Sequence, residues 1–199
     1  RRVLFRSLKA ILIGDASVGK TCIAQRIVHG TFNESTFATI GAANLSVKIE
    51  TEKKTVVFNI WDTAGQERYR SLAPMYFNGA GVGFMVFDLT RKSTFDALTQ
   101  FYSLIEQKAP EDIAVILVGN KKDLPEEDRC IDPDDIKEFQ NRIHAKFYIE
   151  TSAKTGENIE ELFKKVADLD DLSFEPEVNE FVEVTDSQDN NTEGKKGCC

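Results

Sequence analysis

Residues 14–21, GDASVGKT, contain two glycines five positions apart, followed directly by Lys20 and Thr21. This spacing matches a phosphate-binding loop, in which backbone N–H groups surround the phosphates and the lysine reaches the outer ones. An apolar run at 8–13 and a helical pattern at 21–29 supply the strand and helix that such a loop requires. The simpler alternative is a glycine turn with a surface lysine. The candidate phosphate-binding residues are Ala16, Ser17, Val18, Gly19, Lys20, Thr21 and Cys22.

A second motif, WDTAGQE at 61–67, follows another apolar run. Asp62 stands at the end of the expected strand, where a carboxylate can reach Mg²⁺ through a water molecule. Gly65 offers a backbone N–H to a terminal phosphate. Gln66 is neutral and could orient a water for in-line attack, which makes it the candidate catalytic residue. Tetrapeptides of the form DxxG are also common in ordinary turns, so this motif has meaning only together with the first.

Two further loops, NKKD at 120–123 and TSAK at 151–154, each follow a predicted strand and carry groups that suit guanine. The carboxylate of Asp123 can accept from the ring N–H and the amino group of guanine together, which adenine does not offer. A site built on such pairing rejects the mismatched base by roughly 10⁴-fold or more. A solvated loop is the alternative for NKKD alone. Asn120 would support the loop, the stem of Lys121 would pack along the base, and the N–H of Ala153 would meet the guanine carbonyl. The candidate base-binding residues are Asn120, Lys121, Asp123, Ser152, Ala153 and Lys154.

Short apolar runs alternate with segments of helical periodicity, and this alternation predicts an α/β fold with a mainly parallel sheet covered on both faces. We expect a three-layer sandwich of the P-loop NTPase type, with six strands and about five helices. Ligands of such sheets bind at the carboxyl ends of the strands. A period of two over 45–50 predicts a half-buried strand, with a tight hairpin at 53–56. The other predicted strands are 8–13, 56–60, 82–87, 114–118 and 147–149, and the predicted helices are 21–29, 93–108, 133–143 and 159–172.

Composition indicates one soluble domain followed by an acidic tail. The chain has 199 residues, 41% of them hydrophobic, and a net charge of −8. Residues 168–199 hold ten acidic and two basic residues, against 23 of each before them, so neither part has a basic surface for nucleic acid. No apolar run approaches the roughly 20 residues of a transmembrane helix, and basic residues interrupt any secretory signal. We expect a domain at 1–172 and a disordered tail at 173–199.

The cysteines stand at positions 22, 130, 198 and 199, a pattern that makes no disulfide framework. Two adjacent cysteines cannot staple a domain. A reducing compartment, the cytosol, is therefore expected.

Taken in order, GDASVGKT, WDTAGQE, NKKD and ETSAK resemble the Ras-type small GTPases over about residues 8–172. TIGAA at 39–43, ERYRSLAPMYF at 67–77 and the terminal Cys-Cys resemble Rab proteins, most closely the early-endosomal group. The resemblance implies the residues that hold the ligands. Thr21 and Thr39 would ligate Mg²⁺, Asp62 would act behind a water, Lys20 would hold the outer phosphates, Phe32 would lie against the base, and Thr39 and Gly65 would sense the terminal phosphate.

The same resemblance implies a membrane-anchored switch that binds GTP, hydrolyses it slowly to GDP and recruits effectors in vesicle traffic, of the endocytic kind. Residues 31–38 contain no Arg or Lys, so this loop cannot supply an arginine finger. We therefore expect intrinsic turnover on the order of 10⁻⁴ per second, raised about 10⁵-fold by an activating protein. A guanine-nucleotide-binding module that recruits partners without hydrolysis is the alternative. A P-loop kinase has less support, since no basic lid is evident.

Partners follow from the resemblance as well: an exchange factor, a GTPase-activating protein, a GDP dissociation inhibitor or escort protein, and GTP-dependent effectors. A monomer is expected on the cytosolic face of an endosomal membrane, cycling with the cytosol. The expected effector surface comprises Ile40, Gly41, Asn44, Trp61 and Tyr76. The family pairs this tryptophan with an aromatic residue at 76 and with a phenylalanine where this chain has Asn44, so the effector contact should be altered. Partial burial of Trp61 in the core is the alternative.

The chain ends in Cys198 and Cys199, which the Rab resemblance assigns to double geranylgeranylation. A pair of exposed thiols is the alternative. Only Lys195 and Lys196 stand near them, so no polybasic patch assists a single lipid, and we expect both lipids to be needed.

Overall fold

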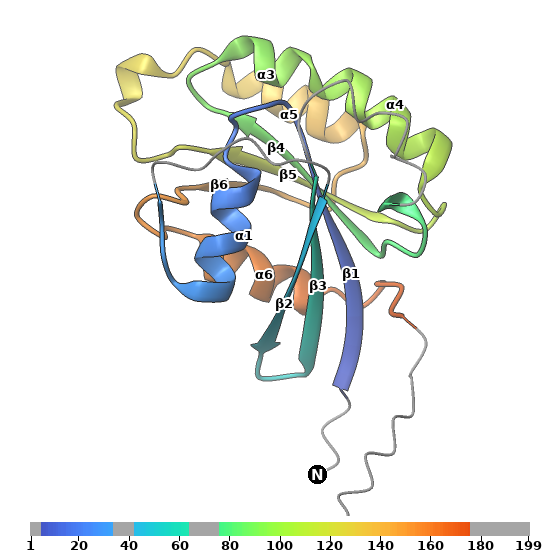
Figure 1. Cartoon of the computed structure of the whole chain (residues 1–199). Coiled ribbons are helices and arrows are strands. Elements are labelled where there is room, and N and C mark those ends of the chain that lie inside the picture. Colours follow the sequence, from blue (N-terminus) through green and yellow to red (C-terminus); the bar gives the residue numbers. More distant parts are fainter. Residues whose placement is uncertain (1–4, 34–41, 64–75, 176–199) are drawn as a thin grey trace, which may run out of the picture.

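A six-stranded sheet in the order β2-β3-β1-β4-β5-β6 forms the centre of the protein (Figure 1). The computed structural model describes residues 5–33, 42–63 and 76–175. Only β2 runs antiparallel to its neighbour, and the other pairs are parallel. The strands are β1 Phe5–Ile13, β2 Ala42–Glu50, β3 Thr55–Thr63, β4 Val82–Asp88, β5 Ala114–Asn120 and β6 Tyr148–Thr151.

The burial pattern of each strand follows from its place in the sheet. All residues of β4 and β5 are buried, as expected for central parallel strands covered on both faces. In β2, which lies at the edge, Leu45, Val47 and Ile49 are covered while the residues between them are exposed. The predicted alternation therefore holds, and it fixes which face of β2 and β3 is apolar.

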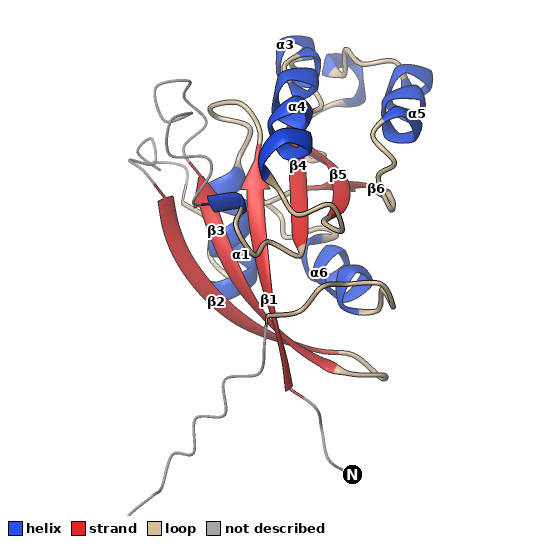
Figure 2. Ribbon diagram, turned by 90° about the vertical axis from the view of Figure 1, so that its right-hand side faces the viewer, coloured by secondary structure: helices blue, strands red, loops and turns tan. Residues whose placement is uncertain are grey.

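Five α-helices cover the two faces of the sheet in the described parts of the chain (Figures 1 and 2). One apolar cluster lies between the sheet and the pair α1 and α6, and a second lies between the sheet and the group α3 to α5. The helices are α1 Lys20–His29, α3 Lys92–Asp96, α4 Leu98–Lys108, α5 Pro133–Arg142 and α6 Ile159–Ala167, with a short 3₁₀ turn, η2 Glu126–Asp128. None of the helices in these parts has the length and apolar character that crossing a bilayer requires.

Two helix predictions need correction. The helix predicted at 93–108 is two helices, because the N–H of Gln100 bonds to the oxygen of Ala97, over three residues instead of four, and this interrupts the ladder. The helix predicted at 159–172 ends at Ala167. Three aspartates at 168, 170 and 171 follow it, and negative charge at a helix carboxyl end is unfavourable.

The hairpin between β2 and β3 also lies earlier than predicted. The N–H of Thr51 donates to the oxygen of Lys54 at 2.9 Å, so the turn occupies 51–54 instead of 53–56. The Thr51 hydroxyl further accepts from the N–H groups of Lys53 and Lys54. A threonine that bonds to the backbone in this way favours a turn at its own position.

Contacts with the sheet continue beyond the expected domain boundary at residue 172. The N–H of Glu175 donates to the oxygen of Ser7 at 2.8 Å, and its carboxylate accepts from Asn59 at 2.7 Å. The guanidinium of Arg6 lies 4.9 Å from the centre of the Phe174 ring. The packed body therefore includes residues 173–175. Residues 176–199 lie outside the described part of the chain, so the division into domain and tail stays a prediction there.

Candidate nucleotide-binding site

The phosphate loop, residues 14–21, joins the carboxyl end of β1 to the amino end of α1. Gly14 and Gly19 have φ of 148° and 98°. A Cβ on Gly14 would lie 2.1 Å from the Val86 oxygen, and one on Gly19 would lie 2.3 Å from the side-chain nitrogen of Asn120, so only glycine fits at either position. No side chain among the described residues caps α1. The positive end of the helix dipole lies at this loop and favours a bound anion.

Lys20 places a positive charge across this loop. Its side chain is buried, and its Nζ donates to the carbonyl oxygens of Gly14 at 2.9 Å and Asp15 at 2.8 Å. Burial lowers the pKa of Lys20 to about 8, against the charges of Asp62 and Asp15, which raise it. The ammonium is thus held in a fixed position where phosphate oxygens would restore part of the solvation that it lost.

Thr21 and Asp62 come together although they are 41 residues apart. The Thr21 hydroxyl donates to Oδ2 of Asp62 at 2.6 Å, and the carboxylate is 1% exposed. Hydroxyl and carboxylate oxygens are the ligands that Mg²⁺ prefers, and this ion is commonly held by one or two protein groups together with phosphates. The donor set at the end of β3 and the start of α1 therefore fits Mg²⁺.

Asn120 connects the base loops to the phosphate loop. Its side chain is buried, its Nδ2 donates to the carbonyl oxygen of Val18 at 2.8 Å, and its Oδ1 accepts from Thr151 Oγ1 and from the N–H of Ala153, both at 3.2 Å. One side chain thus joins its own loop to the phosphate loop and to the segment 151–153 at the end of β6. The Ala153 N–H, which was expected to meet the guanine carbonyl, donates to Asn120 in this structure.

The remaining base-loop residues lie at the same edge of the sheet. Asp123 is exposed, and its Oδ1 accepts from the hydroxyl of Ser152 at 2.6 Å. Lys154 is exposed. The sequence motifs did not predict which residue holds the loop that carries Lys154. Arg26 of α1 does so, since its Nε donates to the carbonyl oxygen of Ala153 at 2.9 Å. A long-range contact of this kind leaves no local pattern in the sequence.

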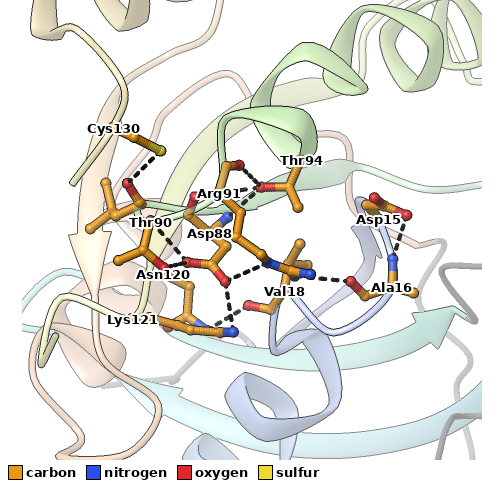
Figure 3. Close-up of polar contacts among 11 residues, drawn as sticks. Asp15, Ala16, Val18, Asp88, Thr90, Arg91, Thr94, Asn120, Lys121 and Cys130 are labelled. Carbon is orange, nitrogen blue, oxygen red and sulfur yellow. Dashed lines mark hydrogen bonds and ion pairs between the residues drawn. The ribbon is translucent and has the colours of Figure 1, made fainter. Parts of the chain in front are cut away.

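Lys121 has an ion-pair partner that the sequence motifs do not indicate. Its Nζ lies 2.7 Å from Oδ2 of Asp88, and Nε of Arg91 lies 2.9 Å from the same oxygen (Figure 3). Although burial alone would raise the pKa of Asp88, hydrogen bonds from Lys121 and Thr90 outweigh it and hold that pKa below its ordinary value. Asp88 ends the buried run of β4. A carboxylate at the carboxyl end of a central strand is a signal that could have identified it.

A model of the Ras family matches residues 9–169 of the chain. The chain belongs to the Ras family. It is 40% identical to a putative Ras-related protein Rab-5B of Dictyostelium discoideum over 161 residues, which are 81% of this chain and 74% of the relative. It is 39% identical to the GTP-binding protein ypt5 of Schizosaccharomyces pombe over 168 residues, 84% of this chain and 79% of the relative. Human Ras-related protein Rab-22A is 40% identical over 162 residues, with 81% and 82% covered.

These relatives identify the chain as a Rab GTPase related to the early-endosomal group, which confirms the resemblance. The fold of this Rab GTPase is the predicted three-layer α/β sandwich with a six-stranded, mostly parallel sheet.

The predicted effector surface of this Rab GTPase is described at three positions. Asn44 is exposed and is the β2 partner of Trp61 on β3. The Trp61 ring is half-buried, with its centre 5.9 Å from that of Tyr76 and 4.4 Å from Nζ of Lys9. The three predicted residues therefore lie side by side, and an amide occupies the outer position.

The structure describes two more of the predicted residues, and the others lie outside the described ranges. Phe32 is half-buried and packs against the cluster under α1 and α6. Cys22 is half-buried on α1. The predicted residues outside the described ranges are Thr39, Ile40, Gly41, Gly65, Gln66, Cys198 and Cys199.

Proposed function

We propose that this Rab GTPase binds guanine nucleotide with Mg²⁺ at the edge formed by β1, β3, β5 and β6, hydrolyses GTP slowly, and acts as a membrane-anchored switch in endocytic vesicle traffic. The contacts of Asn120 are the observation that carries the proposal. They fix the phosphate loop through Val18 and the last base loop through Ala153, so one ligand can reach both. The names of the Rab-5B, ypt5 and Rab-22A relatives support the traffic role.

Each group has a defined task in this proposal. Lys20 and the first N–H groups of α1 bind the phosphates, and Asp123 accepts from the guanine ring. Thr21 and Thr39 would ligate Mg²⁺ directly and Asp62 would act through a water, and the ion would neutralise phosphate charge when bound. Ser152 orients Asp123, since its hydroxyl donates to that carboxylate.

The hydrolytic step falls to Gln66, which we propose orients the attacking water. Thr39 and Gly65 sense the terminal phosphate, so its loss releases the loops that carry them. Residues 31–38 bring no Arg or Lys to compensate charge in the transition state. Turnover is therefore slow, on the order of 10⁻⁴ per second, until an activating protein supplies that charge.

The cycle that we propose involves an exchange factor, an activating protein, a GDP dissociation inhibitor or escort protein, and effectors that bind the GTP form. Two lipids on Cys198 and Cys199 would hold the protein on the cytosolic face of an endosomal membrane. Replacing either cysteine with serine should release most of the protein into the cytosol, which fractionation of cells measures. Unchanged membrane retention would count against the lipid assignment.

Equilibrium titration tests the binding part directly. Fluorescent GDP and ADP are titrated into the purified protein with magnesium, and GDP should bind at least about 10⁴-fold more tightly. Asp123→Ala should remove most of that preference, whereas Asp128→Ala, at an exposed acid of the nearby turn η2, should keep it. Equal affinity for the two nucleotides would reject the proposal. Single-turnover hydrolysis of GTP then separates a slow GTPase from a recruitment module that does not hydrolyse its ligand.

A further inference from the structure

Three charged side chains connect the phosphate loop to the base loop on a path separate from Asn120. Arg91 donates through Nη2 to the carbonyl oxygen of Ala16 at 3.2 Å and through Nε to Oδ2 of Asp88 at 2.9 Å. Lys121 lies 2.7 Å from the same Asp88 oxygen. Figure 3 shows this row of contacts from Ala16 through Arg91 and Asp88 to Lys121. One carboxylate therefore binds one cation from each of two loops.

Asp88 is a fixed anchor for these cations. Its side chain is 1% exposed, and its other oxygen, Oδ1, accepts from the N–H of Thr90 at 3.0 Å and from the hydroxyl of Thr90 at 2.8 Å. Its own N–H donates to the Thr94 hydroxyl at 3.0 Å. Both carboxylate oxygens therefore have hydrogen-bond partners, and these contacts hold the carboxylate in one orientation. A guanidinium that is already bound to such a carboxylate loses little further freedom when it holds a second acceptor.

The carbonyl that Arg91 holds sets the direction of an N–H group in the phosphate loop. In a trans peptide the carbonyl and the following N–H point in opposite directions. Holding the Ala16 oxygen toward Arg91 therefore turns the N–H of Ser17 to the opposite side. Ser17 has φ of 60°, a left-handed conformation that a non-glycine residue adopts only where its surroundings impose it.

Two anchors thus hold the loop from outside, Arg91 at Ala16 and Asn120 at Val18, while Lys20 bonds to Gly14 and Asp15. Asn120 belongs to the guanine motif, whereas Arg91 belongs to no motif of the sequence.

We propose that Arg91 is a positioning residue that keeps the phosphate loop in its nucleotide-binding shape and, through Asp88, couples that loop to Lys121, so that bound GDP leaves slowly. This inference rests on the proposed function, because it requires guanine nucleotide in the site. The proposed role of Arg91 requires no contact with the reacting atoms. Its effect reaches the phosphates through the backbone of residues 16 and 17.

The coupling makes the effect depend on the phosphates of the ligand. GDP binds to both the phosphate loop and the base loop, so its affinity should fall when the phosphate loop loses its contact with Arg91. GMP has one phosphate and depends more on the base loop, so it should lose less. General destabilisation of the fold would weaken the two nucleotides alike, and the ratio of their affinities therefore separates positioning from a structural role.

The test measures the rate at which fluorescent GDP leaves the full chain when excess unlabelled GDP is added. Arg91→Met keeps the apolar stem and removes the guanidinium, and it should accelerate release about tenfold, because a hydrogen bond from a charged donor is lost. Lys92→Met is the matched control, since Lys92 forms ion pairs with Asp96 and Asp135 and lies over the Phe95 ring, away from both loops. The control should release GDP at the wild-type rate.

The outcomes separate the two proposals. A release rate for Arg91→Met within twofold of the Lys92→Met rate overturns the role of Arg91, as does an equal loss of GDP and GMP affinity. Should Arg91→Met fail to fold, Arg91→Lys carries the test. One ammonium cannot hold both acceptors as the guanidinium fork does, so release about threefold faster is expected, and a wild-type rate overturns the proposal. A wild-type chain that binds no GDP would instead reject the proposed function itself.

Discussion

The hydroxyl of Thr21 and the carboxylate of Asp62 are 2.6 Å apart, and this contact joins the second residue of α1 to the end of β3. If the pair receives Mg²⁺, Thr21→Val should weaken Mg²⁺ binding to the GDP complex at least about tenfold, because the isosteric side chain keeps the shape and lacks the oxygen. The Mg²⁺ concentration that halves the GDP release rate measures the effect. Ser103→Ala, at a half-buried residue of α4 whose hydroxyl donates to the carbonyl oxygen of Thr99, is the control. Equal Mg²⁺ dependence in both variants would exclude Thr21 as a ligand.

Asn120→Ala should lower the free energy of unfolding by about 3 kcal/mol, because three hydrogen bonds of a buried amide are lost and their partners stay unsatisfied. Asn141→Ala, at an exposed position of α5, should change it by less than about 0.5 kcal/mol. Urea unfolding without nucleotide and with saturating GDP measures both. The variant should also gain less stability from GDP than the wild type. A gain equal to that of the wild type would show that Asn120 does not shape the ligand site.

Local patterns were sufficient to predict the sheet and the position of the site. The buried runs of β4 and β5, and the alternation of Leu45, Val47 and Ile49, identify strands because they reflect burial on two faces or one. The motif at 14–21 connects β1 to α1 as predicted. Its two glycines have positive φ and no room for a Cβ, which is why this spacing of glycines is a specific signal.

The contacts that hold the site together could not be predicted in the same way. Arg91 and Ala16 are 75 residues apart, and Asn120 and Val18 are 102 apart. Such contacts depend on the conformations of the loops between the strands. The periodicity of apolar residues carries no information about those conformations. The break at Ala97 has a similar cause, because it depends on which carbonyl Gln100 selects and not on a helix-breaking residue.

Gly19→Ala should prevent tight nucleotide binding, because the new Cβ would lie 2.3 Å from the side chain of Asn120 and would displace it. Gly30→Ala is a matched control. It also has a positive φ, of 68°, but a Cβ there meets nothing within 4 Å, so only the cost of the left-handed backbone remains, about 1 kcal/mol. GDP titration of the two variants makes the comparison. If both lost affinity to the same extent, backbone strain and not the clash with Asn120 would be the cause.

Asp88→Asn should lower the free energy of unfolding by about 2 kcal/mol at pH 7, because the contacts of Arg91 and Lys121 lose their charged acceptor. The pKa of Asp88 is lower in the folded protein than its ordinary value. The stability that it contributes is therefore complete well above the ordinary aspartate pKa of about 3.9 and is lost as the pH falls through the lower pKa of the folded protein. Urea unfolding of wild type and variant at pH 7, 5, 4 and 3.5 should show their difference shrinking. A difference that stayed constant or grew would contradict this assignment.

Asn44→Phe should leave the fold intact and restore the aromatic residue that the family pairs with Trp61. Asn44 is exposed and lies opposite Trp61, so the new ring would pack beside the tryptophan and change the free energy of unfolding by no more than about 1 kcal/mol. Calorimetry with the GTP-loaded protein and an effector of an early-endosomal Rab should give tighter binding than the wild type. Ser46→Phe, at another exposed position of β2, controls for added apolar surface. Equal gains from both substitutions would mean that hydrophobicity alone, and not the position beside Trp61, strengthens the contact.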